Sequence, residues 1–240
     1  MSSLNDIWVY LSATPLLGLT LTLVAYQAAY WLYERAGFHP LLNPVAITVA
    51  LIVTALLLTH TPYSTYFSGA QFIHFLLGPA TVALAIPLYG QINKLKQAWR
   101  SVLLALVCGS ATAAGSAVLI AWMLGASPLT LKSLAPKSVT TPIAMGIAEK
   151  IGGLPSLTAV LVMCTGILGA VLAKYILDAL RIRDHAARGF AAGVAAHGIG
   201  TARAFQVSEE AGAFAGLGMG LNAVMTALIV PLALWLLGRF

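Results

Sequence analysis

Long apolar runs separated by short polar stretches dominate the sequence. A helix needs roughly 20 apolar residues to cross the hydrocarbon core of a bilayer. The clearest runs of about that length cover residues 7–33, 101–124, 157–177 and 212–237. With shorter elements between them, the chain has room for about seven or eight membrane segments. The pattern therefore predicts an all-α, polytopic integral membrane protein with a single transmembrane domain over residues 1–240.

Asparagine and proline positions predict where several helices begin or break. Asn43 is followed by proline, a combination typical of a helix start, so a helix is expected to run from there to about Leu58. Pro79 and Pro87 fall inside the apolar segment 72–92. A proline inside a helix removes a hydrogen bond and kinks or breaks the helix, so this segment is expected to be discontinuous.

Two polar stretches, 135–142 and 197–203, interrupt the apolar second half of the chain. Lipid cannot satisfy open backbone groups, so such stretches persist at membrane depth only where protein surrounds them or water reaches them. Interrupted helices in a membrane are the usual construction of a transporter's substrate site. The residues expected to break the helices here are Pro136, Pro142, Gly198 and Gly200.

The first interruption is expected to lie in a re-entrant element. Lys and Arg gather in residues 94–100 and 181–188, and such basic loops tend to lie in the cytoplasm. Both clusters lie on that side if residues 128–150 enter and leave the membrane on the other side. A short similarity between residues 84–88 and 139–143 also favours inverted repeats, although apolar sequence produces such matches by chance.

The composition supports a membrane setting and excludes one class of function. Only 8% of the residues are charged, against about 25% in a soluble domain, and 60% are hydrophobic. The net charge of +6 is not arranged as a basic stripe interleaved with aromatic residues. We therefore expect the lipid bilayer as a partner and no nucleic acid.

Enzymatic motifs are absent from the sequence. It contains no Walker loop, no HExxH and no GxSxG, and the pair Gly198 and Gly200 lacks the third glycine and the preceding strand of a dinucleotide loop. The two cysteines have no metal-ligand spacing. We therefore expect no enzyme, no cofactor and no metal site. An intramembrane hydrolase that uses Ser138 and His197 is the remaining enzymatic alternative.

The first polar stretch contains the groups that an anion site needs. Thr141 is positioned to cap a helix whose first turn holds Pro142, and a helix N-terminus carries partial positive charge. That end contributes up to about 2 kcal/mol, whereas desolvating a carboxylate costs several kcal/mol. The full charge of Lys137 supplies the difference, and Ser138 and Thr140 add hydroxyl donors. The alternative is that Lys137 reaches the membrane surface and the hydroxyl groups only cap the helix.

The second polar stretch adds three candidates, His197, Thr201 and Arg203. An ionisable group costs about 2.5–3.5 kcal/mol in a membrane segment, so it usually faces a cavity or a partner. Arg203 can bind a carboxylate through two parallel hydrogen bonds, and His197 titrates near neutral pH and can relay a proton. The alternatives are that a neighbouring helix satisfies His197 and that Arg203 pairs with a glutamate at 209 or 210.

Two asparagines in other segments are also candidates. Asn43 and Asn222 could line the same cavity, and Asn43 joins the expected substrate-binding set. Interhelical hydrogen bonds explain both residues equally well.

Three segments together resemble one known family. Residues 136–145 read PKSVTTPIAM, residues 197–204 read HGIGTARA, and residues 77–89 read LGPATVALAIPLY. In this combination they are similar to the LrgB/CidB family, and the likeness extends from about residue 40 to the end of the chain. The resemblance implies a multi-pass protein of the bacterial inner membrane, often encoded beside a smaller membrane protein of the LrgA/CidA type.

The resemblance implies two functional descriptions. One is a holin-like or antiholin-like regulator of murein hydrolase export and cell lysis. The other is a carrier of small 2-oxo or 2-hydroxy monocarboxylates, as in the plastid glycolate/glycerate translocator and in bacterial relatives linked to pyruvate.

The sequence favours the carrier, with the lysis regulator as the alternative. We predict a secondary transporter of small monocarboxylates that works by alternating access around the two interruptions and couples to a proton through His197. In this hypothesis Lys137 and Arg203 neutralise the anion, and the hydroxyl groups of the first stretch orient it. The expected partners are a small organic acid anion, the bilayer, a protein of the LrgA/CidA type and further copies of the chain.

Overall fold

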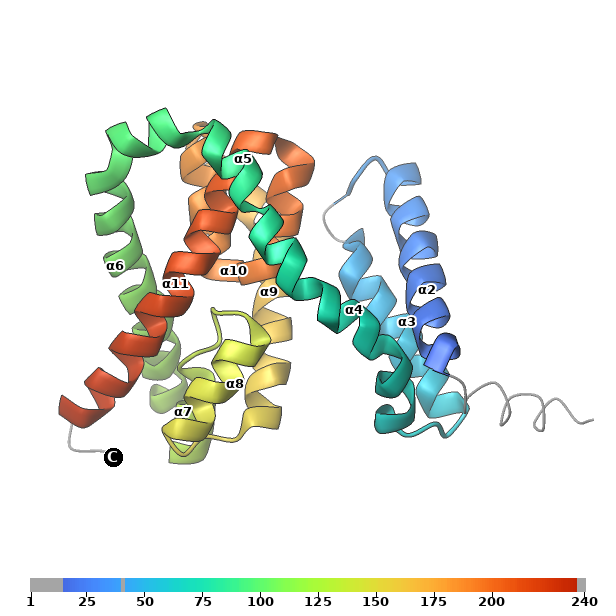
Figure 1. Ribbon diagram of the computed structural model, residues 1–240. Helices are drawn as coiled ribbons and strands as arrows, with labels where there is room; N and C mark the ends of the chain where they lie inside the picture. The colour runs from blue at the N-terminus through green and yellow to red at the C-terminus, as the bar shows by residue number, and fades with distance from the viewer. Residues whose placement is uncertain (1–14, 40–41, 237–240) are drawn as a thin grey trace, which may run out of the picture. The chain divides into compact units, whose positions relative to one another are not determined.

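The computed structural model describes residues 15–39 and 42–236, and every element in this part of the chain is an α-helix (Figure 1). The predicted all-α class is therefore confirmed. The chain divides into two compact units, Met1–Ala83 and Leu84–Phe240.

The described part of the first unit contains three helices. They are α2 (Pro15–Arg35), α3 (Pro44–Leu58) and α4 (Tyr63–Ala83). Helix α2 packs against both α3 and α4. Asn43 caps α3 as its sequence position predicts, because its Oδ1 accepts hydrogen bonds from Val45 N at 2.9 Å and Ala46 N at 3.2 Å. Residues 7–14 of the first apolar run lie outside the described residues.

The second unit contains seven described helices. They are α5 (Ala85–Gly90), α6 (Ile92–Met123), α7 (Pro128–Leu134), α8 (Thr141–Lys150), α9 (Pro155–Ala179), α10 (His185–Val207) and α11 (Glu209–Leu236). Helix α11 is central, since it packs against α5, α6, α8 and α10. Polar groups are enclosed in this unit, whereas large apolar side chains such as Leu104, Leu168 and Leu228 are more than half exposed. That distribution is expected of a protein whose outer surface faces lipid.

The described residues contain fewer helices of membrane-spanning length than the seven or eight segments expected. Among the described residues, four helices are long and apolar enough, namely α2, α6, α9 and α11. The number rises to five if residues 63–73 and 78–90 together make one span. The expected count of seven or eight membrane segments is therefore not confirmed.

The two prolines of segment 72–92 differ in their effects. The segment bends by 40° between Ile73 and Gly78, just before Pro79, and a further irregular residue, Leu84, separates α4 from α5. Pro87 is the third residue of α5, and in a first turn its missing N–H removes no intrahelical bond. The segment is therefore discontinuous as expected, with its bend in the turn before Pro79, whereas Pro87 interrupts no helix.

Residues 128–150 form two short helices joined by a loop, and we call them the first hairpin. Helices α7 and α8 have seven and ten residues, or about 10 and 15 Å, against a hydrocarbon core of about 30 Å. Neither helix can cross a bilayer. The base of the hairpin is closed at Ser133, whose Oγ accepts from Leu154 N at 2.8 Å and whose backbone O accepts from Thr158 Oγ1 at 2.9 Å.

Helix α10 is interrupted near its middle and turns back on itself, and we call residues 185–207 the second hairpin. Ala196 and His197 leave helical geometry, with His197 at a φ of 41°. Gly200 packs so closely on the backbone of Ala192 that an added Cβ would lie 2.6 Å from the Ala192 oxygen. Eight residues of straight helix would separate the two by about 12 Å. The two arms of the hairpin therefore lie against each other.

The second break lies before the glycines that the sequence marks. Gly198 and Gly200 both belong to the second arm and have helical conformations, whereas the reversal occurs at Ala196 and His197. Gly200 has a different use, because the contact between the two arms leaves no space for a side chain. Glycine at position 200 therefore allows the two arms to pack closely, and no unusual backbone conformation is needed there.

The two hairpins enter the second unit from opposite ends of α9. The first joins the C-terminal end of α6 to the start of α9, and the second joins the end of α9 to the start of α11. Figure 1 shows the yellow first hairpin and the orange second hairpin approaching the middle of the unit from opposite ends. Their tips can therefore meet halfway along α9.

Small residues bring the first arm of the second hairpin against α11. Gly189 lies on the backbone of Ala211, and an added Cβ would overlap the Ala211 oxygen. Gly193 lies in the same way on the backbone of Ala215, so this arm and α11 run parallel in backbone contact. Close backbone approach through small residues is a common way to pack helices in a membrane.

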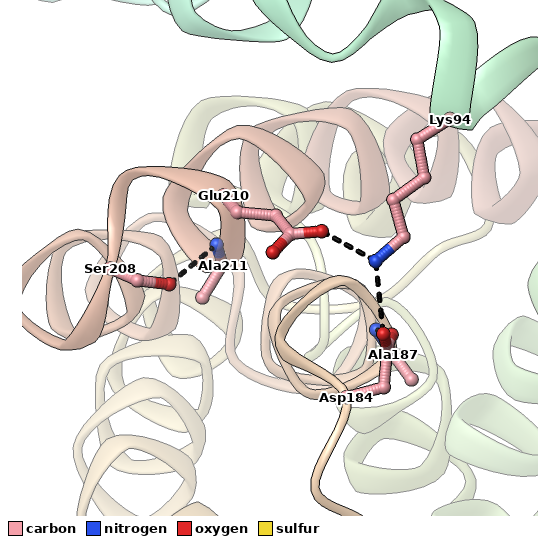
Figure 2. A network of polar contacts seen from close by, with 6 residues as sticks. All are labelled: Lys94, Asp184, Ala187, Ser208, Glu210 and Ala211. Carbon is pink, nitrogen blue, oxygen red and sulfur yellow. Dashed lines mark hydrogen bonds and ion pairs between the residues drawn. The ribbon is translucent and has the colours of Figure 1, made fainter.

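A charged network fastens the base of the second hairpin to α6 (Figure 2). Lys94 Nζ lies 2.9 Å from Asp184 Oδ2 and also donates to Glu210 Oε1. Asp184 caps α10 by accepting from Ala187 N at 2.8 Å, and Ser208 caps α11 through its Oγ. One lysine therefore connects the residues just before and just after the hairpin.

We predict that Gly193→Ala destabilises the protein, whereas Gly220→Ala does not. The first substitution forces a methyl group into the backbone of α11, and overpacking of this kind costs about 1–3 kcal/mol. Gly220 has open space around it, and alanine is the better helix former by about 1 kcal/mol. Thermal unfolding of both variants in detergent measures the difference, and equal midpoints would contradict the proposed contact.

The charged network predicts a dependence of stability on acid. The pKa of Asp184 lies below its ordinary value of 3.8 because the Ala187 N–H and the Lys94 ammonium both bond the charged carboxylate. Because the pKa of Asp184 is lower in the folded protein than in the unfolded chain, the charged carboxylate stabilises the fold. This stabilisation is complete above the unfolded pKa and is lost as the pH falls through the folded one. Between about pH 5 and about pH 3 the unfolding midpoint should fall more in the wild type than in Asp184→Asn, which keeps a capping side chain. Parallel pH profiles of the two proteins would refute the assignment.

Candidate functional site

The tips of the two hairpins meet at Asn222, in the middle of α11. This side chain is fully buried. Its Nδ2 donates to Ser138 O of the first hairpin at 3.1 Å and to Val194 O of the second at 2.9 Å. Carbonyl groups can only accept, so the amide nitrogen must face them. One side chain therefore serves backbone groups at both interruptions.

The oxygen of the same amide is also fully used. Asn222 Oδ1 accepts from Ser110 Oγ of α6 at 2.6 Å and from Thr226 Oγ1 of α11 at 3.2 Å. A primary amide has two donors and two acceptor positions, and here all four have partners. The interhelical explanation of Asn222 is the one that the structure shows, and it connects α6 and α11 to both hairpins.

Lys137 contributes a positive charge beside this contact. Its Nζ donates to Ser138 Oγ at 3.3 Å, and the residue is partly buried. Among the described residues, no carboxylate oxygen lies within 4.0 Å of Lys137 Nζ. Ser138 O shares the Asn222 amide with Val194 O, which lies three residues before His197. The first polar stretch and the residues just before the second therefore meet at Asn222.

His197 is held at the tip of the second hairpin by α9. The residue is 5% exposed, and its Nε2 lies 3.0 Å from Val162 O. Since that carbonyl can only accept, Nε2 carries a proton. Gly166 makes room for the ring, because an added Cβ would lie 2.6 Å from Cε1. Contact with a neighbouring helix was one explanation of His197 at the level of sequence, and the structure shows that contact.

The backbone of His197 adopts a conformation that favours glycine. Its φ of 41° is unusual for a residue with a side chain and carries strain. Thr201 Oγ1 donates to the His197 carbonyl at 2.8 Å, and the ring is held by α9. Thr201 is itself buried and therefore supports the break from within the second arm.

The two threonines of the first stretch lie at the start of α8. Thr140 is the residue before the helix, and Thr141 is its first residue, one position later than expected for the cap. The Thr140 side chain makes no capping hydrogen bond, and Pro142 lies in the first turn. The hydroxyl groups of Thr140 and Thr141 are partly buried near the tip of the first hairpin, which also contains Pro136.

Arg203 lies at a different site from Lys137. It is six residues beyond His197, about 9 Å along the second arm, and lines a cavity near the base of that hairpin. Its Nη1 donates to Gln206 Oε1 at 3.0 Å. The expected clamp of Lys137 and Arg203 on one anion is therefore not formed in this structure.

Two supporting residues at the tips carry weak sequence signals. Ser110 is one hydroxyl group in an apolar run, and Gly166 has no local motif at all. Each contacts a residue far away in the sequence. Ser110 donates a hydrogen bond to Asn222, and Gly166 packs against the His197 ring. Asn43, by contrast, belongs to the first unit, where its side chain caps α3.

The arrangement at the tips combines a cation, hydroxyl groups, a helix N-terminus and an imidazole. Such groups bind small anions, and the imidazole can exchange a proton. We call Lys137, Ser138, His197 and Asn222 the tip site.

Comparisons with known proteins agree with the family resemblance. The LrgB-like family matches residues 22–236. The chain is 39% identical to "Uncharacterized protein YwbG" of Bacillus subtilis (strain 168), over 91% of this chain and 97% of that protein. It is 31% identical to "Antiholin-like protein LrgB" of Bacillus mycoides (strain KBAB4), over 94% of this chain and 98% of the relative. No solved structure matches the chain.

The match covers both hairpins, the tip site and the membrane-length helices of the second unit. It also includes the three segments on which the resemblance rests, 77–89, 136–145 and 197–204. Long apolar helices and antiholin-like relatives are both consistent with a membrane protein. On these grounds the chain belongs to the LrgB-like family.

Proposed function

We propose that this chain is a secondary carrier that binds a small monocarboxylate anion at the tip site and moves it across the bacterial inner membrane. The observation that carries the proposal is the charge of Lys137. Among the described residues, no carboxylate lies within 4.0 Å of its ammonium, which donates to Ser138 Oγ at 3.3 Å. A partly buried cation that has no acidic partner is costly in a protein interior and favours an anionic ligand.

Further groups near Lys137 support a carboxylate as this ligand. Thr140 and Thr141 have hydroxyl groups at the start of α8, and the Thr140 side chain makes no capping bond. The N-terminus of α8 adds partial positive charge. One full positive charge with several neutral donors suits a single carboxylate, the chemistry shared by glycolate, glycerate and pyruvate.

The two hairpins supply a mechanism for alternating access. They enter from opposite ends of α9, and their tips are joined by hydrogen bonds to Asn222. Withdrawing one tip opens the tip site toward one side of the membrane, and withdrawing the other opens it toward the opposite side. His197, at the second tip, is the candidate for coupling to a proton because imidazole titrates near neutral pH. No chemical change of the anion is required.

The carrier is tested by uptake of labelled glycolate or pyruvate into liposomes. Lys137→Gln should reduce saturable uptake about tenfold or more, since a charge-assisted hydrogen bond contributes about 1.5–3 kcal/mol. Lys150→Gln, at the exposed end of α8, is the matched control and should transport as the wild type does. Lys137→Arg should restore part of the uptake. Absence of saturable uptake by the wild type, or equal uptake by both glutamine variants, would reject the proposal.

A second candidate function is antiholin-like regulation of murein hydrolase export and cell lysis. It is favoured by relatives at 31% identity that are named antiholin-like protein LrgB, a name that fits this function better than it fits transport. Such a role would use further partners, a small membrane protein of the LrgA/CidA type or other copies of the chain.

The two candidates differ in whether lysis depends on Lys137. We predict that cells carrying Lys137→Gln in place of the native chain lyse at the altered rate of a deletion strain. The reason is that, if the chain is a carrier, any effect on lysis results from transport of the anion, and this variant no longer transports it. Turbidity after addition of a cell-wall antibiotic measures the rate, with Lys150→Gln as control. Wild-type lysis behaviour in the Lys137→Gln strain, together with lost uptake in liposomes, would separate the two roles and favour a regulator that acts without transport.

A further inference from the structure

A cavity of about 160 Å³ lies near the base of the second hairpin, apart from the tip site. It is bounded by the C-terminal part of α9, both arms of α10 and the start of α11. Small residues such as Ala170, Ala173, Gly189 and Ala192 form much of its wall. Because a water molecule occupies about 30 Å³ of liquid volume, the space corresponds to about five waters, enough for one compact polar group.

Charged side chains of opposite sign line this cavity in unequal number. Lys174, Arg188 and Arg203 are cationic, and Asp178 is the carboxylate among the lining residues. Asp178 binds Arg188 Nη1 at 2.6 Å and Lys174 Nζ at 3.1 Å. Among the residues that line the cavity, cations therefore outnumber carboxylates three to one.

The cation nearest the interior is fixed in position. The Arg188 side chain is only 19% exposed, and besides Asp178 its Nη1 donates to Ile182 O at 2.8 Å. Both bonds use the same nitrogen, and a guanidinium has further N–H groups on Nε and Nη2. Arg203 is held by a neutral partner, Gln206, through its Nη1. Two anchored guanidinium groups therefore line one small space.

We propose that this cavity binds a phosphate group. Guanidinium groups match phosphate oxygens through paired hydrogen bonds, and two of them border a space of suitable size. Three lining cations against one lining carboxylate suit a phosphate, which carries up to two negative charges, better than a second carboxylate. The phosphate comes either from the headgroup of an anionic phospholipid, which basic pockets between membrane helices bind, or from a soluble phosphate with the same oxygens.

Occupation of the cavity has a mechanical consequence for the second hairpin. The lining residues come from α9 and from both arms of α10, so a bound phosphate links three helical segments. Arg188 stands on the first arm and Arg203 on the second. A phosphate held by both residues stabilises the closed base of the hairpin. This inference does not depend on what the tip site carries.

Two arms of one experiment test the site in the purified full chain in neutral detergent. In the first, inorganic phosphate is titrated at constant ionic strength and the unfolding midpoint is followed. In the second, phosphatidylglycerol or phosphatidylcholine is added, and native mass spectrometry counts the retained lipid. We expect saturable binding in at least one arm, weakened about tenfold or more by Arg188→Gln and by Lys174→Gln. Lys96→Gln, an exposed position on α6, is the control and should bind as the wild type does.

Asp178→Asn distinguishes a phosphate site from a purely structural ion pair. Removing the carboxylate raises the positive excess, so binding should become severalfold tighter. If the pair with Arg188 served only to join α9 to α10, the same change would weaken binding or leave it unaltered. Lys174 and Asp178 are both about half exposed, so their substitutions are compatible with folding.

The outcomes separate the two sources of phosphate. A response to inorganic phosphate without lipid supports a soluble ligand, and a response confined to phosphatidylglycerol supports a headgroup. No saturable response in either arm overturns the proposal. Equal losses in Lys96→Gln and Arg188→Gln, or weaker binding by Asp178→Asn, overturn it as well.

Discussion

A buried amide with four hydrogen bonds determines how this chain can interrupt two helices inside a bilayer. Lipid offers no partner to a backbone carbonyl, so each interruption must find its donors within the protein. Asn222 donates to one carbonyl from each hairpin, and its oxygen is held by hydroxyl groups of α6 and α11. Loss of any partner would leave a polar group unsatisfied in a dry interior, at a cost of about 1–3 kcal/mol. The positions of both tips are therefore coupled through one side chain.

The hairpins are fastened differently at their bases and at their tips. The base of the first hairpin is closed by Ser133, which bonds Leu154 and Thr158. The base of the second is tied to α6 through Lys94. The tips, by contrast, are joined by hydrogen bonds to a single amide, and these can be exchanged for bonds to a ligand or to water. Both hairpins are therefore fixed at their bases, and only exchangeable hydrogen bonds join their tips. This arrangement allows one tip to move while the other stays in place.

Local signals in the sequence were sufficient for helix starts, but the reversal of α10 depends on distant contacts. Asn43 caps the helix that its position predicts, because capping involves only the next three residues. The break at His197 lies where no glycine or proline stands, since the residue is held there by Val162 of α9 and by Thr201. The sequence predicts Gly200 as a helix breaker. In the structure it lies against the backbone of Ala192, where a side chain has no space.

The composition of the candidate site was predictable only in part, for the same reason. Polar residues in an apolar chain identify Lys137, Ser138 and His197, of which Lys137 and Ser138 are in contact and His197 lies at the tip of the other hairpin. The sequence also groups Arg203 with them, because it lies six positions from His197. The second arm of the hairpin carries Arg203 away from the tip to the cavity lined by Arg188. Sequence spacing alone does not show that the chain reverses at His197, so it could not predict that Arg203 lies away from the tip.

The closed tip contact bears on the choice between a carrier and a pore. A pore needs a polar path that stays open, whereas Asn222 is fully buried and His197 is 5% exposed where the two hairpins meet. The polar groups at this contact bond one another rather than line an open passage. An antiholin-like role for this chain would therefore act through a partner or through the consequences of anion movement, and not through a permanent opening at the tip site. A carrier, on the other hand, requires such a barrier in the middle of the membrane, because alternating access depends on the two sides never being open together.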